Sequence, residues 1–192
     1  MTPLTTPPLV VVMVGSHGVG KSSVARRLAD NSFESNPVEV TIGPEFFRKT
    51  VVVRQRAIKA QIWDTAGQEK FGAITRGYVP LPPRWPFSCR PSLSYFRNAL
   101  GAVLVYEISD KESYNALDHW LTKVRDWAPD ATICLVGNKS DLNSRRKVTT
   151  EEGQRYAKAN EIGLFFETSA LNGNNIKQTF CDLMAGERPK VT

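Results

Sequence analysis

A glycine-rich segment near the N-terminus, Gly15 to Ser22, leaves this chain few possible folds. Its sequence, GSHGVGKS, matches the pattern GxxxxGK[ST] and follows Leu9 to Val14, a valine-rich run typical of a strand buried on both faces. Residues Lys21 to Asp30 then have the pattern of a helix. Backbone N–H groups can wrap a phosphate only where side chains do not obstruct them, and the N-terminal end of a helix attracts anions. The order strand, glycine turn, helix therefore predicts a phosphate-binding loop.

Individual positions of this loop have predictable chemical roles. The Lys21 ammonium can reach the β- and γ-phosphates of a nucleotide, and the Ser22 hydroxyl can ligate Mg²⁺. The predicted nucleotide contacts are Gly15, Ser16, His17, Gly18, Val19, Gly20, Lys21, Ser22 and Ser23. The motif indicates a nucleotide but does not distinguish one base from another.

A second polar segment, DTAGQE at 64 to 69, follows a strand predicted at Ile58 to Trp63. In a nucleotide-binding chain of this kind, Asp64 at the carboxyl end of a strand is the expected partner of Mg²⁺, through water. The Gly67 amide can approach a γ-phosphate, and the Gln68 side chain can orient a water molecule. The alternative is a capped turn whose acid is simply solvated.

A third segment, NKSD at 138 to 141, indicates that the base is guanine. The Asp141 carboxylate can accept hydrogen bonds from both N1–H and the exocyclic amine of guanine, a donor pair that adenine lacks. Asn138 can bond to the phosphate loop or to the base, and the Lys139 stem can pack over the ring. An ATP-dependent enzyme is therefore disfavoured.

A fourth segment, Ser169 to Leu171, follows the short strand predicted at Leu164 to Phe166. Here Ser169 and Ala170 can present a backbone amide to the guanine O6. All four segments come at the carboxyl ends of predicted strands, which is the edge where open α/β sheets bind their ligands. Their order and placement together make a strong signal for a guanine nucleotide.

Strands and helices alternate along the chain, which predicts an α/β fold with a mostly parallel six-stranded sheet and helices on both faces. The predicted strands are 9–14, 46–53, 58–63, 101–108, 133–136 and 164–166. The predicted helices are 21–30, one capped by Ser109 or Asp110 that ends at Pro129, one at 151–160 after a capping box of Thr149 and Glu152, and one from Asn174 or Asn175 to near Met184.

Composition narrows the remaining classes. The 192 residues are 41% hydrophobic and 23% charged, which predicts one globular domain and no disordered chain, and no apolar run is long enough for a transmembrane helix. The net charge of +6 would favour nucleic acid, but no basic stripe with interleaved aromatics occurs outside residues 79 to 95, so no nucleic-acid partner is predicted. Cys89, Cys134 and Cys181 are too scattered for a zinc site or a disulfide framework, and fit a reducing compartment.

Together these segments resemble a Ras-superfamily small GTPase, most of all the Rab branch and its recycling-endosome type. The segments that carry the resemblance are GSHGVGKS (15–22), TIGPEF (41–46), KAQIWDTAGQEKF (59–71), GAVLVYEI (101–108), GNKSDL (137–142) and ETSAL (167–171). The resemblance implies the P-loop NTPase fold, with GTP or GDP and Mg²⁺ bound. It also implies a monomeric switch that hydrolyses GTP slowly and serves vesicle trafficking.

The resemblance assigns residues that the motifs above do not. Thr41 is similar to the switch threonine whose hydroxyl ligates Mg²⁺, and Phe33 is similar to the aromatic that packs edge-on against guanine. Residues 35–47 and 65–78 correspond to the surfaces that contact effectors, exchange factors and GTPase-activating proteins. These protein partners are therefore expected beside the guanine nucleotide.

Catalysis is expected to depend on Gln68, Lys21 and Gly67. Gln68 would position the attacking water while Lys21 and Mg²⁺ offset the developing charge, with unaided turnover on the order of 10⁻⁴ to 10⁻³ per second. His17 departs from the family, in which this loop position is small, and we hypothesise that its imidazole slows hydrolysis. The alternative for His17 is that the ring lies in solvent. A chain with impaired hydrolysis would be a GTP-binding interaction module.

Residues 79 to 95, VPLPPRWPFSCRPSLSY, interrupt the resemblance with five of the chain's twelve prolines. The segment has neither helical nor strand periodicity, and it lies where a compact α/β domain needs only a short connection. Three interpretations are open: a partner-binding loop, a disordered bulge, and an unspliced intron in the coding sequence.

We expect residues 1–8 to form a flexible arm, 9–186 the GTPase domain with its insert at 79–95, and 187–192 a short tail. No cysteine is placed for lipidation, so no lipid anchor is expected in this chain. The expected location is cytoplasmic, with endomembrane association only if a prenylated tail is missing from the chain.

Overall fold

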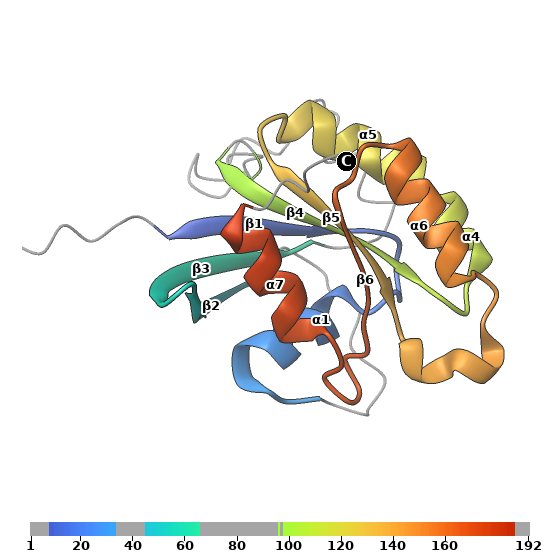
Figure 1. The fold of residues 1–192 in the computed structure, drawn as a ribbon, viewed down its shortest axis with the longest axis horizontal. Coiled ribbons are helices and arrows are strands. Elements are labelled where there is room, and N and C mark those ends of the chain that lie inside the picture. The colour runs from blue at the N-terminus through green and yellow to red at the C-terminus, as the bar shows by residue number, and fades with distance from the viewer. Residues whose placement is uncertain (1–7, 34–44, 66–95, 97, 187–192) are drawn as a thin grey trace, which may run out of the picture.

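The computed structural model describes residues 8–33, 45–65, 96 and 98–186, arranged around a six-stranded sheet (Figure 1). The strands are β1 (Leu9–Val14), β2 (Glu45–Val53), β3 (Arg56–Asp64), β4 (Ala99–Glu107), β5 (Thr132–Asn138) and β6 (Leu164–Glu167). The helices are α1 (Lys21–Asp30), α4 (Lys111–Asn115), α5 (Leu117–Trp127), the 3-10 helix η3 (Ser140–Arg145), α6 (Thr150–Ala159) and α7 (Ile176–Ala185). The predicted α/β fold is confirmed.

The sheet has the order β2-β3-β1-β4-β5-β6, and every neighbouring pair is parallel except β2 with β3. The hairpin between β2 and β3 turns at Arg54 and Gln55, whose φ values of 49° and 65° are those that a tight two-residue hairpin turn requires. Because the other five strands run in one direction, their carboxyl ends meet at one edge of the sheet. The polar segments predicted from the sequence follow these strand ends.

Helices cover both faces of the sheet, as predicted. Val11 and Met13 of β1 belong to a core cluster with α1 and α7, whereas Val12 and Val14 belong to a second cluster with α5 and α6. Figure 1 shows the same division, with α1 and α7 on one face and α4, α5 and α6 on the other. Residues Val11 to Val14 of the valine-rich run are fully buried because alternate side chains enter both clusters.

The single helix predicted between residues 109 and 129 is in fact two helices, α4 and α5. Asp110 caps the first, since its carboxylate accepts a hydrogen bond from the Glu112 N–H at 3.0 Å. The break falls at Ala116, whose ψ of −2° departs from the helical value of about −42°. The predicted span is therefore right and the predicted continuity is wrong.

Other local signals are confirmed. Thr149 and Glu152 form the predicted capping box, in which each side chain accepts from the backbone N–H of the other residue. Asn175 is the residue that precedes α7. Within the described ranges, no helix has the length and apolar character needed to cross a membrane. Residues 1–7, 79–95 and 187–192, which include most of the predicted arm and all of the insert and tail, lie outside the described residues.

Candidate nucleotide-binding site

The loop between β1 and α1 passes so close to two neighbouring strands that it needs glycine. Gly15 has φ +145° and Gly20 has φ +92°, in the region that side chains disfavour. A Cβ on Gly15 would lie 2.2 Å from the Val105 carbonyl oxygen, and a Cβ on Gly20 would lie 2.4 Å from the Asn138 side-chain nitrogen. The path of the loop is therefore set by β4 and β5 as well as by its own backbone.

Lys21 begins α1, and its side chain folds back over the loop. Nζ donates to the carbonyl oxygens of Gly15 at 3.0 Å and Ser16 at 2.8 Å, and the residue is only 5% exposed. The ammonium is thus a fixed positive charge beside the N-terminal end of a helix, where the helix dipole also favours anions. This arrangement suits a phosphate group. His17 and Gly18 are exposed on the outer turn of the same loop.

Two oxygen-bearing side chains of the kind that Mg²⁺ prefers lie next to the loop. Ser22 Oγ donates to Asp64 Oδ2 at 2.5 Å, and Asp64 is fully buried at the end of β3. Thr65 Oγ1 donates to the Met13 carbonyl at 2.7 Å, which holds the chain after β3 against β1. Mg²⁺ takes hard oxygen ligands, usually one or two carboxylates together with substrate phosphates. The hydroxyl and carboxylate present here therefore fit Mg²⁺.

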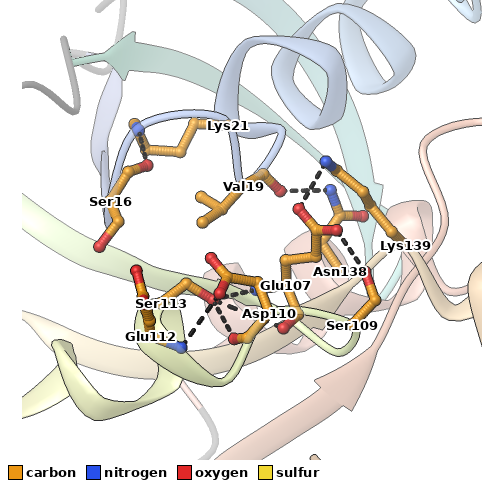
Figure 2. Close-up of polar contacts among 10 residues, drawn as sticks. All are labelled: Ser16, Val19, Lys21, Glu107, Ser109, Asp110, Glu112, Ser113, Asn138 and Lys139. Atoms are coloured by element: carbon orange, nitrogen blue, oxygen red, sulfur yellow. Dashed lines mark hydrogen bonds and ion pairs between the residues drawn. The ribbon is translucent and has the colours of Figure 1, made fainter. Parts of the chain in front are cut away.

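Asn138 connects the phosphate loop to the segment predicted to recognise the base. Its Nδ2 donates to the Val19 carbonyl at 2.8 Å, its Oδ1 accepts from the Thr168 hydroxyl at 3.1 Å, and the residue is 1% exposed. Figure 2 shows Val19 between Lys21 on one side and Asn138 on the other. The two ends of the predicted site are therefore held in one framework.

The other residues of the base segment have protein partners too. Lys139 has φ +63°, and its Nζ forms an ion pair with Glu107 Oε2 at 2.6 Å (Figure 2). The Ser109 hydroxyl donates to the second carboxylate oxygen of Glu107. The Ser169 hydroxyl donates to Asp141, so two residues predicted separately to contact guanine lie side by side.

A bidentate ion pair links the chain after η3 to β6. Arg146 Nη1 and Nη2 donate to the two carboxylate oxygens of Glu167 at 2.5 and 2.9 Å, and both side chains are mostly buried. Hydrogen bonding to Glu167 raises the pKa of the Arg146 guanidinium, so its charge persists across the physiological range. The Ser140 N–H also donates to the Thr168 carbonyl at 2.9 Å. The two base segments are thus joined by both side-chain and backbone contacts.

Most of the predicted nucleotide contacts meet at the carboxyl edge of the sheet. They are residues 15–23, Asp64, 138–141 and 169–171. Phe33 is half-buried just beyond α1. Outside the described residues lie Thr41, Gly67, Gln68 and most of segments 35–47 and 65–78. The roles assigned to this last group remain predictions.

Several residues that hold the site were not predicted from the sequence, among them Glu107 and Trp120. Glu107 ends β4, so the rule that ligands bind at the carboxyl ends of strands could have identified it. Trp120 of α5 donates from Nε1 to Ser16 Oγ at 3.3 Å. The position of Trp120 in the sequence did not indicate this contact, because any apolar core residue of a helix has the same spacing.

Known proteins match this chain on both sides of the proline-rich insert. A family model described as "Ras family" matches residues 10–81 and 90–187, and the intervening residues 82–89 lie within the predicted insert. Ras-related protein Rab-4B of Homo sapiens is 42% identical over 170 residues, which are 88% of this chain and 71% of the relative. Ras-related protein Rab-11B of Dictyostelium discoideum is 42% identical over 174 residues, which are 90% of this chain and 70% of the relative. Ras-related protein RABA4b of Arabidopsis thaliana is 40% identical over 176 residues, 91% and 70% of the two chains.

The matched residues include both ends of the site. They contain the loop that holds Lys21 and the segments that hold Asp141 and Ser169, so the likeness extends well beyond a shared phosphate loop. The sheet order and the helices on both faces agree with it. The chain belongs to the Ras family, as a Rab-like small GTPase that hydrolyses GTP and serves vesicle trafficking.

Proposed function

We propose that the carboxyl edge of the sheet binds GTP and GDP through a phosphate end and a base end. The phosphate end is residues 15–23, and the base end is Phe33, Asn138, Lys139, Asp141 and Ser169 to Leu171. The observation that carries the proposal is the hydrogen bond from Asn138 to the Val19 carbonyl, because it holds the two ends in a fixed relation. Asp141 would select guanine by accepting from N1–H and the exocyclic amine.

Mg²⁺ would be held directly by Ser22 and Thr41 and through water by Asp64. The hydrogen bond between Ser22 and Asp64 supports this for two of the three residues, because it brings a hydroxyl and a carboxylate to one point beside the phosphate loop. Such an ion supplies positive charge to the β- and γ-phosphates.

Hydrolysis would occur by in-line attack of water on the γ-phosphate. The new bond to the water oxygen replaces the bond to the β-phosphate oxygen, and the products are GDP and inorganic phosphate. Gln68 would orient the water, the Gly67 amide would contact the γ-phosphate, and Lys21 would offset the spreading charge. The two carbonyl contacts of Lys21 support its role, because an ammonium already in place needs no reorganisation.

The protein partners would bind through segments 35–47 and 65–78 of a monomeric, cytoplasmic domain spanning 9–186. Phe46, at the start of the edge strand β2, is 47% exposed, and its ring centroid lies 5.2 Å from that of Trp63. An exposed Phe46 that packs on the partly buried Trp63 supports a protein-contact surface there, because aromatic residues are enriched in interfaces.

Nucleotide analysis of the purified chain tests the proposal. We expect GDP or GTP at one molecule per chain, and phosphate release from GTP that needs Mg²⁺ and proceeds on the order of 10⁻⁴ to 10⁻³ per second. A chain that carries ATP or no nucleotide would contradict guanine binding. A chain that retains GTP for hours without releasing phosphate would contradict hydrolysis and favour the interaction module.

A further inference from the structure

Arg27, on the second turn of α1, connects this helix to a loop 143 residues away in the sequence. Its Nε donates to the Ala170 carbonyl at 2.7 Å, and its Nη2 donates to the Leu171 carbonyl at 2.6 Å. Its Nη1 donates to the carbonyl of Asn31, the residue that follows α1, at 2.9 Å. Each nitrogen of the guanidinium therefore holds a different backbone carbonyl.

These contacts involve both segments that would enclose the base. Ala170 and Leu171 lie in the loop proposed to face the guanine O6, and Phe33 is proposed to pack against the edge of the ring. The guanidinium carbon of Arg27 lies 5.8 Å from the centroid of the Phe33 ring. One half-buried side chain thus contacts two segments that are distant in sequence.

The contacts also set the direction of backbone donors in the loop. A trans peptide group is planar, with its N–H opposite to its C=O, so an Ala170 carbonyl that faces Arg27 turns the Leu171 N–H away from α1. The Ser169 carbonyl accepts from the Gly173 N–H at 2.8 Å, which orients the Ala170 N–H in the same manner. The amides available to a base oxygen are therefore fixed before any ligand binds.

Arginine is suited to this task and lysine is not. The guanidinium is a rigid planar fork, so its Nε and one Nη can hold two successive carbonyls at once. A lysine ammonium carries the same charge on a flexible stem and has no such paired geometry. Replacement of Arg27 by lysine therefore separates the charge of the side chain from its shape.

We propose that Arg27 is a positioning residue that holds the base-binding loop against α1 and thereby slows the release of guanine nucleotide. Two charge-assisted hydrogen bonds must break before this loop can move away from the helix. A loop that is already ordered also loses less entropy when the base binds. The inference rests on the proposed role of residues 169 to 171 in guanine binding.

Arg125 provides a matched control, because it makes the same kind of contact elsewhere. Its Nη2 donates to the Asn160 carbonyl at 2.7 Å, which ties α5 to the residue after α6. Neither Arg125 nor Asn160 belongs to the proposed nucleotide-binding site. Loss of this contact removes one arginine-to-carbonyl link and leaves the base loop unchanged.

Release of N-methylanthraniloyl GDP, chased with excess GDP in the presence of Mg²⁺, tests the proposal. We expect release from Arg27→Gln to be about tenfold faster than from the unaltered protein, the effect of losing roughly one charge-assisted hydrogen bond. Arg27→Lys should fall between the two, and Arg125→Gln should stay within about twofold of the unaltered protein. Thermal unfolding of the nucleotide-free forms should show similar losses for Arg27→Gln and Arg125→Gln.

The outcomes separate this inference from the function on which it rests. Equal release from the unaltered protein and both Arg27 variants overturns the positioning role while leaving guanine binding intact. Equal acceleration by Arg27→Gln and Arg125→Gln also overturns it, because the effect would then be general destabilisation. Absence of labelled GDP binding by the unaltered protein overturns the proposed function itself. If Arg27→Gln does not fold, the comparison of Arg27→Lys with the unaltered protein still decides the matter.

Discussion

The phosphate end and the base end of the site are held together in different ways. At the phosphate end, Lys21 bonds to two carbonyl groups of its own loop, and Ser22 bonds to Asp64. The side chains proposed to contact phosphate and Mg²⁺ are therefore the same ones that hold the loop. Binding, chemistry and local structure depend there on a few shared groups.

At the base end, part of the support comes from residues outside the set proposed to contact guanine. Arg27 holds the loop after Ser169, and Glu107 holds Lys139, yet neither supporting residue is proposed to touch guanine. Because of this difference, we expect substitutions at the two ends to have different effects. Changes at the phosphate end should affect hydrolysis, whereas changes in the base-end supports should affect only how long a nucleotide stays bound.

The largest effect is expected for Lys21→Met. Loss of the ammonium removes the charge proposed for the β- and γ-phosphates and both carbonyl contacts of the loop, so GDP affinity should fall about 100-fold or more. Titration calorimetry measures this, with the exposed residue Lys158 of α6 changed to methionine as the control. Affinity within a few-fold of the control would show that the phosphate end does not depend on shared groups.

The next largest effect is expected for Asp141→Asn. An asparagine cannot accept both guanine donors but can donate to the additional oxygen of xanthine, so the preference for GDP over xanthosine diphosphate should reverse, with GDP affinity falling about 10- to 100-fold. Competition binding measures the ratio. An unchanged ratio would remove Asp141 from the base end.

His17→Gly should change hydrolysis without changing retention. His17 is exposed on the phosphate loop, where its imidazole would compete for space with Gln68 and with an activating protein. We expect single-turnover hydrolysis to rise about fivefold, which corresponds to about 1 kcal/mol of barrier. The GDP release rate, measured on the same preparation, should stay the same. Equal hydrolysis rates would show that the ring has no influence on the reaction.

The smallest effect is expected for Glu107→Gln. The Glu107–Lys139 pair is partly exposed, so losing it should speed GDP release only about threefold, and the gain should shrink at high salt. Lys111→Gln is the matched control, because Lys111 pairs with Glu152 at the same 2.6 Å distance outside the site. Similar release from the two variants would contradict a supporting role for Glu107.

Much of the recognition chemistry was predictable because its signals are local. The spacing of Gly15, Gly20 and Lys21, and of Asn138 and Asp141, is read within a few residues. The parallel sheet then brings the segments together. The supports were not predictable in this way, because the base-loop acceptors of Arg27 are backbone carbonyls 143 and 144 residues away. Every residue has a backbone carbonyl, so no residue type in the sequence identifies these acceptors.

The break between α4 and α5 was missed for a related reason. It falls at Ala116, and alanine is the strongest helix former, so local propensity indicates a continuous helix. The break is therefore a consequence of the surrounding structure. The strands β3 and β4 likewise begin two residues earlier than predicted, because Arg56 and Ala57 pair with β2 and Ala99 pairs with β1.

Single-turnover hydrolysis of GTP already bound to the Arg27→Gln variant tests the division between the two ends most directly. Phosphate release and nucleotide release are followed in the same sample with Mg²⁺ present. Our account predicts that the hydrolysis rate stays within about twofold of the unaltered protein while nucleotide release rises about tenfold. A hydrolysis rate that falls in step with retention would contradict it.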